Sequence, residues 1–236
     1  GSIGRALVAA AVAAELRVFV IDLAASLARH PPPQGVQSWA CDASDEDQVG
    51  AAFAGIAAHC DGLEGFVNLV GFKLARTPIE ALPLAAWDEG IAGNLRSAFL
   101  LSRAALPLLR RGRDAAIVHV SSGLGSYGGQ GYGPYAASKG AIDTLVRILA
   151  NEAAPGIRAN AVAPGLVDTA FVRGGTGRST EDLPPEVDPA EHARRNPLGR
   201  IATPQDLAGP ILFLLGPAAS FVNGQVLHVN GGAYMP

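Results

Sequence analysis

Lysine is nearly absent from this chain. Of its 18 basic residues only Lys73 and Lys139 are lysines, and the other sixteen are arginines. A composition so poor in lysine directs attention to the two that remain. Lys139 follows Tyr135 by four residues, in the run Tyr-Ala-Ala-Ser-Lys. If residues 133–153 form a helix, the two side chains share one face of it and the ammonium can reach the phenol. A neighbouring cation favours the phenolate, so the pair is interpreted as a general acid/base. The alternative is an ordinary surface pair.

Cysteine, net charge and long apolar runs are also scarce. Cys41 and Cys60, the only cysteines, have neither metal-ligand nor redox-pair spacing, which predicts reduced thiols, no metal site and a cytoplasmic location. No uninterrupted apolar stretch approaches the roughly 18 residues of a membrane span. The formal net charge is only −3 and the arginines are dispersed, so we expect neither a nucleic-acid nor a membrane partner.

Strand-like and helix-like segments alternate along all 236 residues. Short β-branched or apolar runs predict strands at 16–21, 37–40, 66–70, 115–120, 157–163 and 225–229. Alanine- and leucine-rich segments with helical spacing predict helices at 3–14, 45–59, 84–111, 133–153 and 204–215. Near-continuous apolar strands between helices are typical of a parallel sheet covered on both faces, so we predict a single α/β domain over 1–236.

Two helix starts and one long connection are visible in the sequence. Ser44 with Asp47, and Thr203 before Pro204, have the pattern of N-terminal caps. The stretch 169–196 is polar, rich in glycine and proline, and long for a connection. We interpret it as a lid over a site, with disorder as the alternative.

The first residues carry a candidate phosphate-binding turn. Gly1-Ser2-Ile3-Gly4 stands directly before a predicted helix, where backbone N–H groups and the helix dipole attract a pyrophosphate. Alone, such glycines more often form a plain turn. Asp22 ends the next predicted strand, where a carboxylate can bind the adenosine ribose hydroxyls; the alternative is a solvated carboxylate. This carboxylate would repel a 2′-phosphate, and no basic residue stands next to it in the sequence, which favours NAD over NADP.

A second candidate contact to the cofactor follows the strand predicted at 37–40. Cys41 and Asp42 stand at the end of this strand and could contact the adenine. The alternative, an aspartate that begins a turn before the helix cap, is nearly as good an interpretation.

Several of these residues together resemble the short-chain dehydrogenase/reductase family, in its one-domain form, over essentially the whole chain. The resemblance rests on Ser122 thirteen residues before Tyr135, on Tyr135-x-x-x-Lys139, on Asn94, on the run Asn-Ala-Val-Ala-Pro-Gly at 160–165 and on the ending Asn-Gly-Gln-Val-Leu-His-Val-Asn-Gly-Gly at 223–232. It implies a doubly wound, mostly parallel, seven-stranded Rossmann-like sheet and a homotetramer or homodimer, with the helices at 84–111 and 133–153 packed across a twofold axis.

The resemblance also implies the catalytic set Asn94, Ser122, Tyr135 and Lys139. Tyr135 would exchange a proton with a substrate alcohol or ketone, and Lys139 would lower the pKa of Tyr135 and bind the nicotinamide ribose. Ser122 would donate a hydrogen bond to the substrate oxygen. Asn94 would lie at a helix distortion and hold a water that links Lys139 to solvent.

Cofactor and substrate contacts complete the expectation. The predicted cofactor-binding residues are Gly1, Ser2, Ile3, Gly4, Asp22, Cys41, Asp42, Asn68, Val70, Gly71, Tyr135, Lys139, Pro164, Gly165, Val167 and Thr169. The predicted substrate residues are Ser122, Leu124, Gln130, Tyr132, Leu166, Phe171 and Arg173, with Gly123 and Tyr127 beside them. Arg173 or Arg178 is the candidate partner of a substrate carboxylate. Without the resemblance, the run from Pro164 to Thr169 is equally well a loop breaker followed by a helix cap.

The chain departs from the family pattern in two informative places. The family's first strand and the opening of its glycine motif are absent, so we expect the sequence to begin late and the sheet to lack that strand. Leu69 and Val70 are bulkier than the residues usual there, which puts the neighbouring cofactor contacts in question.

The leading hypothesis is an NAD-dependent oxidoreductase that acts on a secondary alcohol or the matching ketone. A 3-oxoacyl thioester reductase shares every motif and is the nearest alternative, although such reductases commonly use NADPH. An enoyl reductase is disfavoured, because that branch spaces its tyrosine and lysine more widely. A non-catalytic nucleotide-binding protein of the same fold is the alternative from another class.

Overall fold

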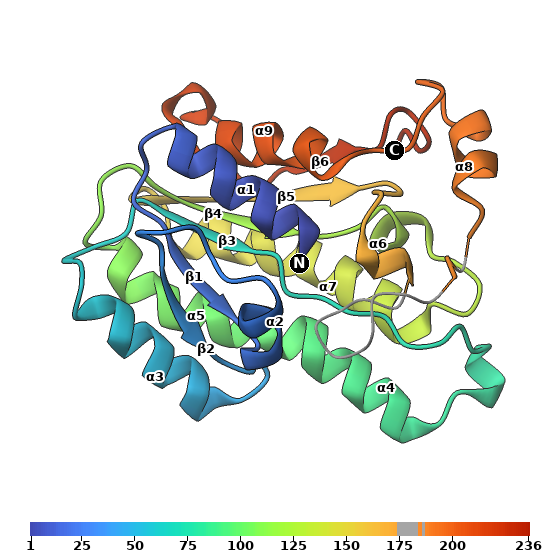
Figure 1. The fold of residues 1–236 in the computed structure, drawn as a ribbon, viewed down its shortest axis with the longest axis horizontal. Coiled ribbons are helices and arrows are strands. Elements are labelled where there is room, and N and C mark those ends of the chain that lie inside the picture. The colour runs from blue at the N-terminus through green and yellow to red at the C-terminus, as the bar shows by residue number, and fades with distance from the viewer. Residues whose placement is uncertain (174–183, 186) are drawn as a thin grey trace.

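The computed structural model describes residues 1–173, 184–185 and 187–236, and its elements alternate as the sequence predicts (Figure 1). The strands are β1 (Phe19–Asp22), β2 (Gln37–Ala40), β3 (Gly65–Asn68), β4 (Ala115–Val120), β5 (Ile157–Pro164) and β6 (Val226–Val229). The α-helices are α1 (Ser2–Ala13), α2 (Ala24–Arg29), α3 (Glu46–Ala57), α4 (Leu84–Ile91), α5 (Ser97–Leu109), α6 (Leu124–Tyr127), α7 (Gly133–Glu152), α8 (Pro189–Arg195) and α9 (Pro204–Leu215). Short helical turns are η1 (Ile79–Ala81), η2 (Ala92–Arg96), η3 (Ala170–Arg173) and η4 (Pro217–Ala219). None of the described helices combines the length and apolarity that a bilayer crossing needs.

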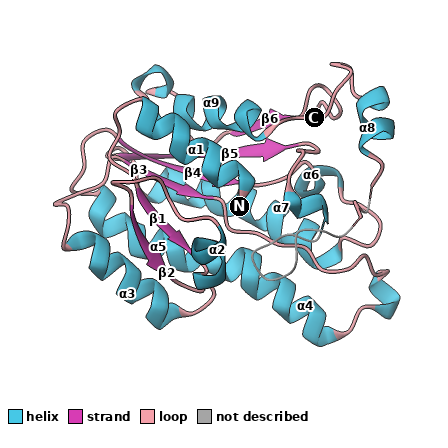
Figure 2. Ribbon diagram, viewed as in Figure 1, coloured by secondary structure: helices cyan, strands magenta, loops and turns pink. Residues whose placement is uncertain are grey.

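Every strand pairing is parallel, and helices cover both faces of the sheet layer (Figure 2). The strands β3, β4, β5 and β6 form one sheet in that order, while β1 and β2 form a second sheet. One apolar core joins α1 and α9 to the sheet, and the other joins α3, α5 and α7 to it. This is the doubly wound α/β arrangement that the alternation predicts, with six strands in the described residues rather than the family's seven.

A deep cavity separates the two sheets. Within the described chain β1 and β3 share no hydrogen-bonded register, and a cavity of about 1940 Å³ lies between them. Phe19 and Ile21 of β1 and Phe66 and Val67 of β3 line its floor. Because all strands are parallel, their carboxyl ends meet at one edge, which is where open α/β sheets bind ligands. The cavity reaches that edge, and its lining also includes residues at the amino ends of the strands, among them Asp114, Arg158 and Gly216.

Two helix boundaries differ from the sequence predictions. The predicted helix 84–111 is interrupted by the π-helical turn η2, so that α4 and α5 are separate elements. The cap of α3 is Asp45 rather than Ser44: the Asp45 carboxylate accepts from the backbone N–H groups of Asp47 and Gln48, whereas the Ser44 hydroxyl donates to Asp42 at 2.7 Å. The predicted cap at Thr203 is confirmed, with Asp206 completing a capping box. The short helices α2 and α8 were not predicted.

A buried histidine connects the central strands to α5. Its Nδ1 lies 3.2 Å from Asn68 Nδ2, and its Nε2 lies 3.0 Å from Ser102 Oγ, so the neutral ring accepts on one side and donates on the other. This histidine is His119 on β4, and it has no exposed surface. Burial, with a smaller contribution from the Lys139 charge, lowers the pKa of His119 to about 3.

Stability should therefore fall as the pH drops below neutrality. The unfolded chain protonates His119 near its ordinary value of 6.5, while the folded chain resists protonation until about 3. Between those values acidification favours unfolding by at most about 1.4 kcal/mol per pH unit. Urea unfolding of His119→Gln at pH 6.5 and 5.0 should show a shallower loss than the parent protein. His59→Gln, at an exposed position, is the control. Equal slopes in the parent and His119→Gln would contradict the assignment.

Candidate active site

Helix α7 carries Tyr135 and Lys139 to the edge where β4 ends. Lys139 is only 3% exposed, and its Nζ donates to the carbonyl of Val120 at 2.8 Å. The same Nζ lies 5.6 Å from the centroid of the Tyr135 ring, so the two side chains share one helix face as their spacing predicts. Both residues line the cavity.

The structure distinguishes between the two adjacent serines at this edge. Both serines line the cavity, and Ser122 is the one that acts on Tyr135, whose pKa it lowers against the effect of burial. Ser121 is buried, and its hydroxyl donates to the backbone carbonyl of Lys139 at 3.2 Å. The side chain available to a ligand beside Tyr135 is therefore that of Ser122, as the thirteen-residue interval predicts.

Asn94 lies in the π-helical turn η2 and is fully buried. Its Nδ2 donates to the carbonyls of Phe72 at 3.0 Å and Gly90 at 2.8 Å, and its Oδ1 accepts from the Phe72 N–H at 3.1 Å. A Cβ placed on Gly71 would come within 3.0 Å of Lys139 Nζ and 3.2 Å of Asn94 Oδ1. The predicted helix distortion is present, and Asn94 fixes the chain that passes over Lys139.

Burial acts on both ionisable groups of this pair, in opposite directions. It raises the pKa of Tyr135 to about 12, against the hydrogen bond with Ser122, which lowers it. It lowers the pKa of Lys139 to about 8, although the Asp143 carboxylate opposes this. The sequence predicted a lowered pKa for Tyr135, and this direction is wrong for the structure described here. The reason is that burial is the largest influence on the phenol and that the neighbouring Tyr132 and Tyr127 add to the rise, which together outweigh the effect of Ser122.

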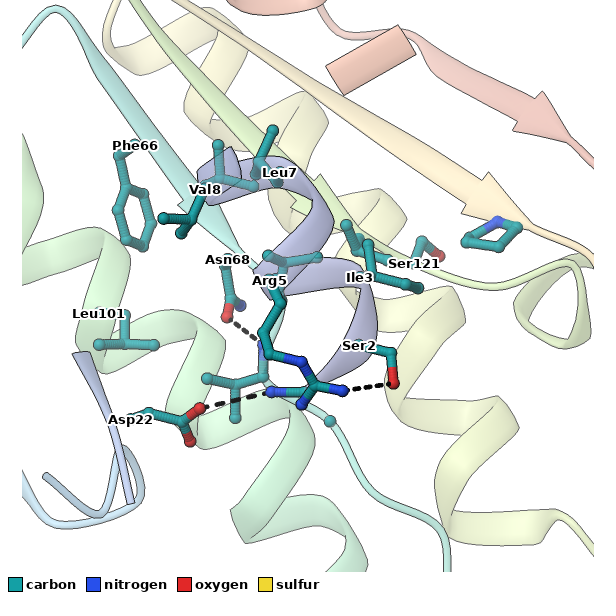
Figure 3. Close-up of a pocket in the computed structure, with 18 of the residues that line it drawn as sticks. Ser2, Ile3, Arg5, Leu7, Val8, Asp22, Phe66, Asn68, Leu101 and Ser121 are labelled. Atoms are coloured by element: carbon teal, nitrogen blue, oxygen red, sulfur yellow. Dashed lines mark hydrogen bonds and ion pairs between the residues drawn. The ribbon is translucent and has the colours of Figure 1, made fainter. Parts of the chain in front are cut away.

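The predicted phosphate-binding turn and ribose-binding carboxylate lie side by side. The terminal amino nitrogen of Gly1 is 3.5 Å from Asp22 Oδ2, and Figure 3 shows Ser2, Arg5 and Asp22 close together. Within the described residues no side chain caps the first turn of α1. Asp22 itself accepts from the Leu23 N–H at 2.8 Å and from a serine hydroxyl at 2.9 Å. The sequence reading found no basic neighbour of Asp22; the fold brings Arg5 toward it.

The remaining predicted cofactor residues fall along the same edge. Those that line the cavity are Gly1, Ser2, Ile3, Gly4, Cys41, Asp42, Asn68, Val70, Gly71, Pro164, Gly165, Val167 and Thr169. Cys41 is only 3% exposed. Asp42 accepts from the N–H of Ser44 at 2.9 Å and so serves the turn that was its alternative interpretation. The bulky Leu69 and Val70 pack against the two apolar cores and also line the cavity.

The predicted substrate residues are only partly brought together. Leu124, Tyr132, Leu166 and Phe171 line the cavity with Ser122, and the Phe171 ring centroid lies 5.8 Å from that of Tyr135.

Gln130 and Arg173 do not line the cavity, which corrects the sequence prediction. Gln130 is exposed and its carbonyl accepts from Arg76 at 3.1 Å. Arg173 pairs with Asp168 at 3.2 Å. Arg178 lies outside the described residues.

Sequence reasoning missed other residues at the substrate end. Lys73 has its Nζ 5.9 Å from the Phe171 ring centroid. His192 and Asn196, from the predicted lid, also line the cavity, as does Tyr234, whose ring lies 5.0 Å from that of Tyr127. Lys73 was detectable in principle, because it is one of only two lysines, but no motif pointed to it.

Comparison with known proteins fits this geometry. A family model described as "Enoyl-(Acyl carrier protein) reductase" matches residues 1–234. The cis-4-hydroxycyclohexanecarboxylate dehydrogenase of Sinomonas cyclohexanicum is 40% identical over 192 residues, which are 81% of this chain and 74% of that protein. This chain belongs to the short-chain dehydrogenase/reductase family. The inactive 2-(S)-hydroxypropyl-CoM dehydrogenase 2 of Xanthobacter autotrophicus is 35% identical over 230 residues, which are 94% of this chain and 97% of that protein.

A solved member of the short-chain dehydrogenase/reductase family has the same fold. The ligand-free aldohexose dehydrogenase of Thermoplasma acidophilum superposes with a TM-score of 0.88 at 30% identity, covering 100% of this chain and 91% of the other. Family members use nicotinamide cofactors, and the chain fits one: the uncapped start of α1, Asp22 and the side-chain-free surface of Gly71 follow each other along the cavity.

Loss of Asn94 should destabilise this short-chain dehydrogenase/reductase strongly. Asn94→Ala removes the partners of both the Phe72 N–H and the Phe72 carbonyl, and each buried group left unpaired costs about 1–3 kcal/mol. Urea unfolding at pH 7 should show a loss of at least about 2 kcal/mol. Asn151→Ala, on the exposed side of α7, should stay within about 0.5 kcal/mol. Similar losses in the two variants would remove Asn94 from this structural role.

Proposed function

We propose that this protein is an NAD-dependent oxidoreductase that interconverts a secondary alcohol and its ketone. The observation that carries the proposal is the convergence of Ser122, Tyr135 and Lys139 beside the end of β4, in a cavity that Asp22 and the start of α1 also line. A nicotinamide cofactor bound along this edge supplies the hydride acceptor or donor. The side chains around it need only hold the substrate oxygen and move its proton.

Each side chain has a distinct task in this proposal. The Tyr135 phenol delivers a proton to the ketone oxygen or removes one from the alcohol. Ser122 donates a hydrogen bond to the same oxygen, where negative charge develops. Lys139 stabilises the phenolate form of Tyr135 by its positive charge and holds the nicotinamide ribose. Asn94 fixes the backbone above Lys139 and holds a water that connects the ammonium to solvent.

Asp22 supports NAD rather than NADP. Its side chain is 35% exposed at the end of β1, beside the start of α1, and one of its oxygens accepts from the Leu23 N–H. A carboxylate held there can accept from ribose hydroxyls and repels a 2′-phosphate. Arg5 lies nearby (Figure 3). Its positive charge opposes the effect of the Asp22 carboxylate on a 2′-phosphate, so the preference between NAD and NADP is tested directly below.

The substrate end supports a cyclic hydroxy acid. Its lining is aromatic and apolar, with Tyr132, Leu166 and Phe171 around the Tyr135 phenol, and Lys73 stands against the Phe171 ring. Lys73 therefore replaces Arg173 as the proposed partner of a substrate carboxylate. The name of the Sinomonas relative supplies the probe, cis-4-hydroxycyclohexanecarboxylate.

Assembly, location and the alternatives follow from the same features. We propose a homotetramer or homodimer through α5 and α7, on whose surfaces Phe99 and Ile148 are each 46% exposed. Both thiols are free, which supports a reducing compartment such as the cytoplasm.

A 3-oxoacyl thioester reductase is the alternative enzyme, and a preference for NADPH over NADH would distinguish it from the proposed function. A non-catalytic nucleotide-binding protein of the same fold is the alternative from another class.

Cofactor preference is tested by thermal unfolding with millimolar NAD+ or NADP+. A ligand at a hundred times its dissociation constant adds about 2.7 kcal/mol, which raises Tm by several degrees. We expect the rise with NAD+ only, and we expect Asp22→Ser to reduce the discrimination between the two. Asp47→Ser, at an exposed position on α3, is the matched control. A larger rise with NADP+ would contradict the role of Asp22, and no rise with either would favour the non-catalytic alternative.

Tyr135→Phe tests the chemistry. The variant keeps the ring but loses the proton, so we expect NADH formation from cis-4-hydroxycyclohexanecarboxylate to fall by about 10²-fold or more. The Tm rise with NAD+ should persist, because the ring and Lys139 remain. Thr144→Val, which removes an exposed hydroxyl from the same helix away from the cavity, should retain most activity. Full turnover by Tyr135→Phe would refute the mechanism.

A further inference from the structure

A row of four side chains at intervals of four residues runs along α7: Tyr135, Lys139, Asp143 and Arg147. Residues at this spacing stack on one helix face. Arg147 is exposed, whereas Asp143 and Lys139 are only 6% and 3% exposed. Positive and negative charges thus alternate from solvent into the protein and end at the phenol of Tyr135. Asp143 takes no part in the mechanism described above.

The Asp143 carboxylate is enclosed by groups that favour its charged form. Burial raises the pKa of Asp143, and the neighbouring Ser121 together with the charges of Arg147, His228 and Lys139 opposes that rise. The one proton of the Ser121 hydroxyl is donated to the Lys139 carbonyl at 3.2 Å. Ser121 therefore lies between the backbone of the lysine and the acid.

Two polar atoms behind Lys139 have no partner within the described chain. They are Asp143 Oδ1 and His228 Nδ1, both buried. His228 comes from β6, and its ring lies 5.5 Å from that of Tyr234. Buried polar atoms are rarely left unpaired without a functional reason. Asp143 and Lys139 are one helical turn apart on α7 and both are buried, so the carboxylate acts on the ammonium electrostatically without forming a close ion pair with it.

We propose that Asp143 is a positioning residue: its buried carboxylate keeps the ammonium of Lys139 charged beneath Tyr135. The proposal rests on the roles assigned above to Tyr135 and Lys139. The other titratable group close to Lys139 on β4 is His119, which is neutral above about pH 3 and supplies no negative charge. The charged residues of α4 and η2, which also pack against α7, are Asp88, Glu89 and Arg96, and all three are exposed. Asp143 is therefore the buried negative charge that Lys139 meets.

The small number of lysines allows Lys139 to be titrated individually by NMR. With ¹³C-labelled lysine the full chain gives two side-chain signals, from Lys73 and Lys139, and Lys73→Arg assigns them. Removing the carboxylate removes a stabiliser of the ammonium, so in Asp143→Asn the titration midpoint of Lys139 should fall by about one pH unit or more. The midpoint of Lys73 should not move. Glu152→Gln, an exposed carboxylate at the end of the same helix, should leave both midpoints unchanged.

The opposing outcome is equally clear. A Lys139 midpoint that is unchanged or higher in folded Asp143→Asn would overturn the proposal and leave Asp143 a purely structural partner of Ser121. Asp143→Ser gives a second charge-removing variant. If neither folds, the reciprocal measurement is the carboxyl ¹³C titration of Asp143 in Lys139→Gln, which must move to higher pH because coupling between two sites is mutual.

Activity adds a readout that separates this proposal from the proposed function. In the plot of kcat/KM against pH, the alkaline limb of Asp143→Asn should lie at lower pH than that of the parent protein. The difference should equal the shift in the Lys139 titration midpoint. Absence of turnover by the parent with every alcohol tried would refute the oxidoreductase while leaving the NMR result intact. A shifted Lys139 midpoint with an unshifted activity limb would refute the link between Asp143 and the chemistry.

Discussion

The ammonium of Lys139 lies in the interior of the molecule, and a buried charge is tolerated only when it is hydrogen-bonded and paired. The burial of this charge constrains segments that are far apart in the sequence. Val120 must end β4 with its carbonyl turned toward α7, at 2.8 Å from Nζ. A side chain on Gly71 would crowd the same nitrogen, because a Cβ there would lie 3.0 Å from it. The packing of α7 under the sheet and the path of the chain after β3 are thus set by one cation.

The same cation explains why the histidine next to it stays neutral. His119 lies on β4 one residue before Val120, and the Lys139 charge adds to burial in disfavouring its protonation. A neutral ring can accept from Asn68 and donate to Ser102, which an imidazolium could not do. The Asn68 carboxamide in turn accepts from the Val70 N–H at 2.9 Å and so fixes the turn that leads to Gly71. The charge of Lys139 in the site and the hydrogen bonds of His119 in the core therefore depend on each other.

Local patterns predicted the elements because their causes are local. The apolar run at 115–120 became β4 unchanged, and Thr203 with Asp206 capped α9, since alternation and capping depend on neighbours in sequence. The interval of thirteen residues favoured Ser122 over Ser121, and Ser121 donates to the Lys139 carbonyl in the structure. The π-helical turn at Asn94 was expected only from the resemblance, because propensity does not indicate such a turn.

Predictions failed where the outcome depends on distant partners. Arg173 was assigned to the substrate, but the fold gives it Asp168 five residues away. Gln130 turned outward, and its carbonyl serves Arg76 from a different loop. Arg5 reached Asp22 across the gap between α1 and β1, which no spacing in the sequence announces. The predicted lowering of the Tyr135 pKa was wrong for the same reason. The change depends on how deeply the fold buries the phenol, and the fold gives Lys139 Nζ the Val120 carbonyl as its acceptor.

That last result bears on the chemistry. With a pKa of about 12 the phenol of Tyr135 is protonated at neutral pH, and it is ready to act as an acid before it can act as a base. Each pKa unit corresponds to about 1.4 kcal/mol of differential interaction, so work in the oxidative direction needs nearby groups that favour the phenolate. Among the described residues the groups placed to do so are the hydroxyl of Ser122 and the ammonium of Lys139. An ammonium with a pKa of about 8 would be partly neutral in mildly alkaline solution, where alcohol oxidation is favoured by mass action on the proton. The buried carboxylate of Asp143, four residues farther along α7, opposes this loss of charge. In the proposed mechanism the basicity of Tyr135 therefore depends on a residue two helical turns away from the phenol.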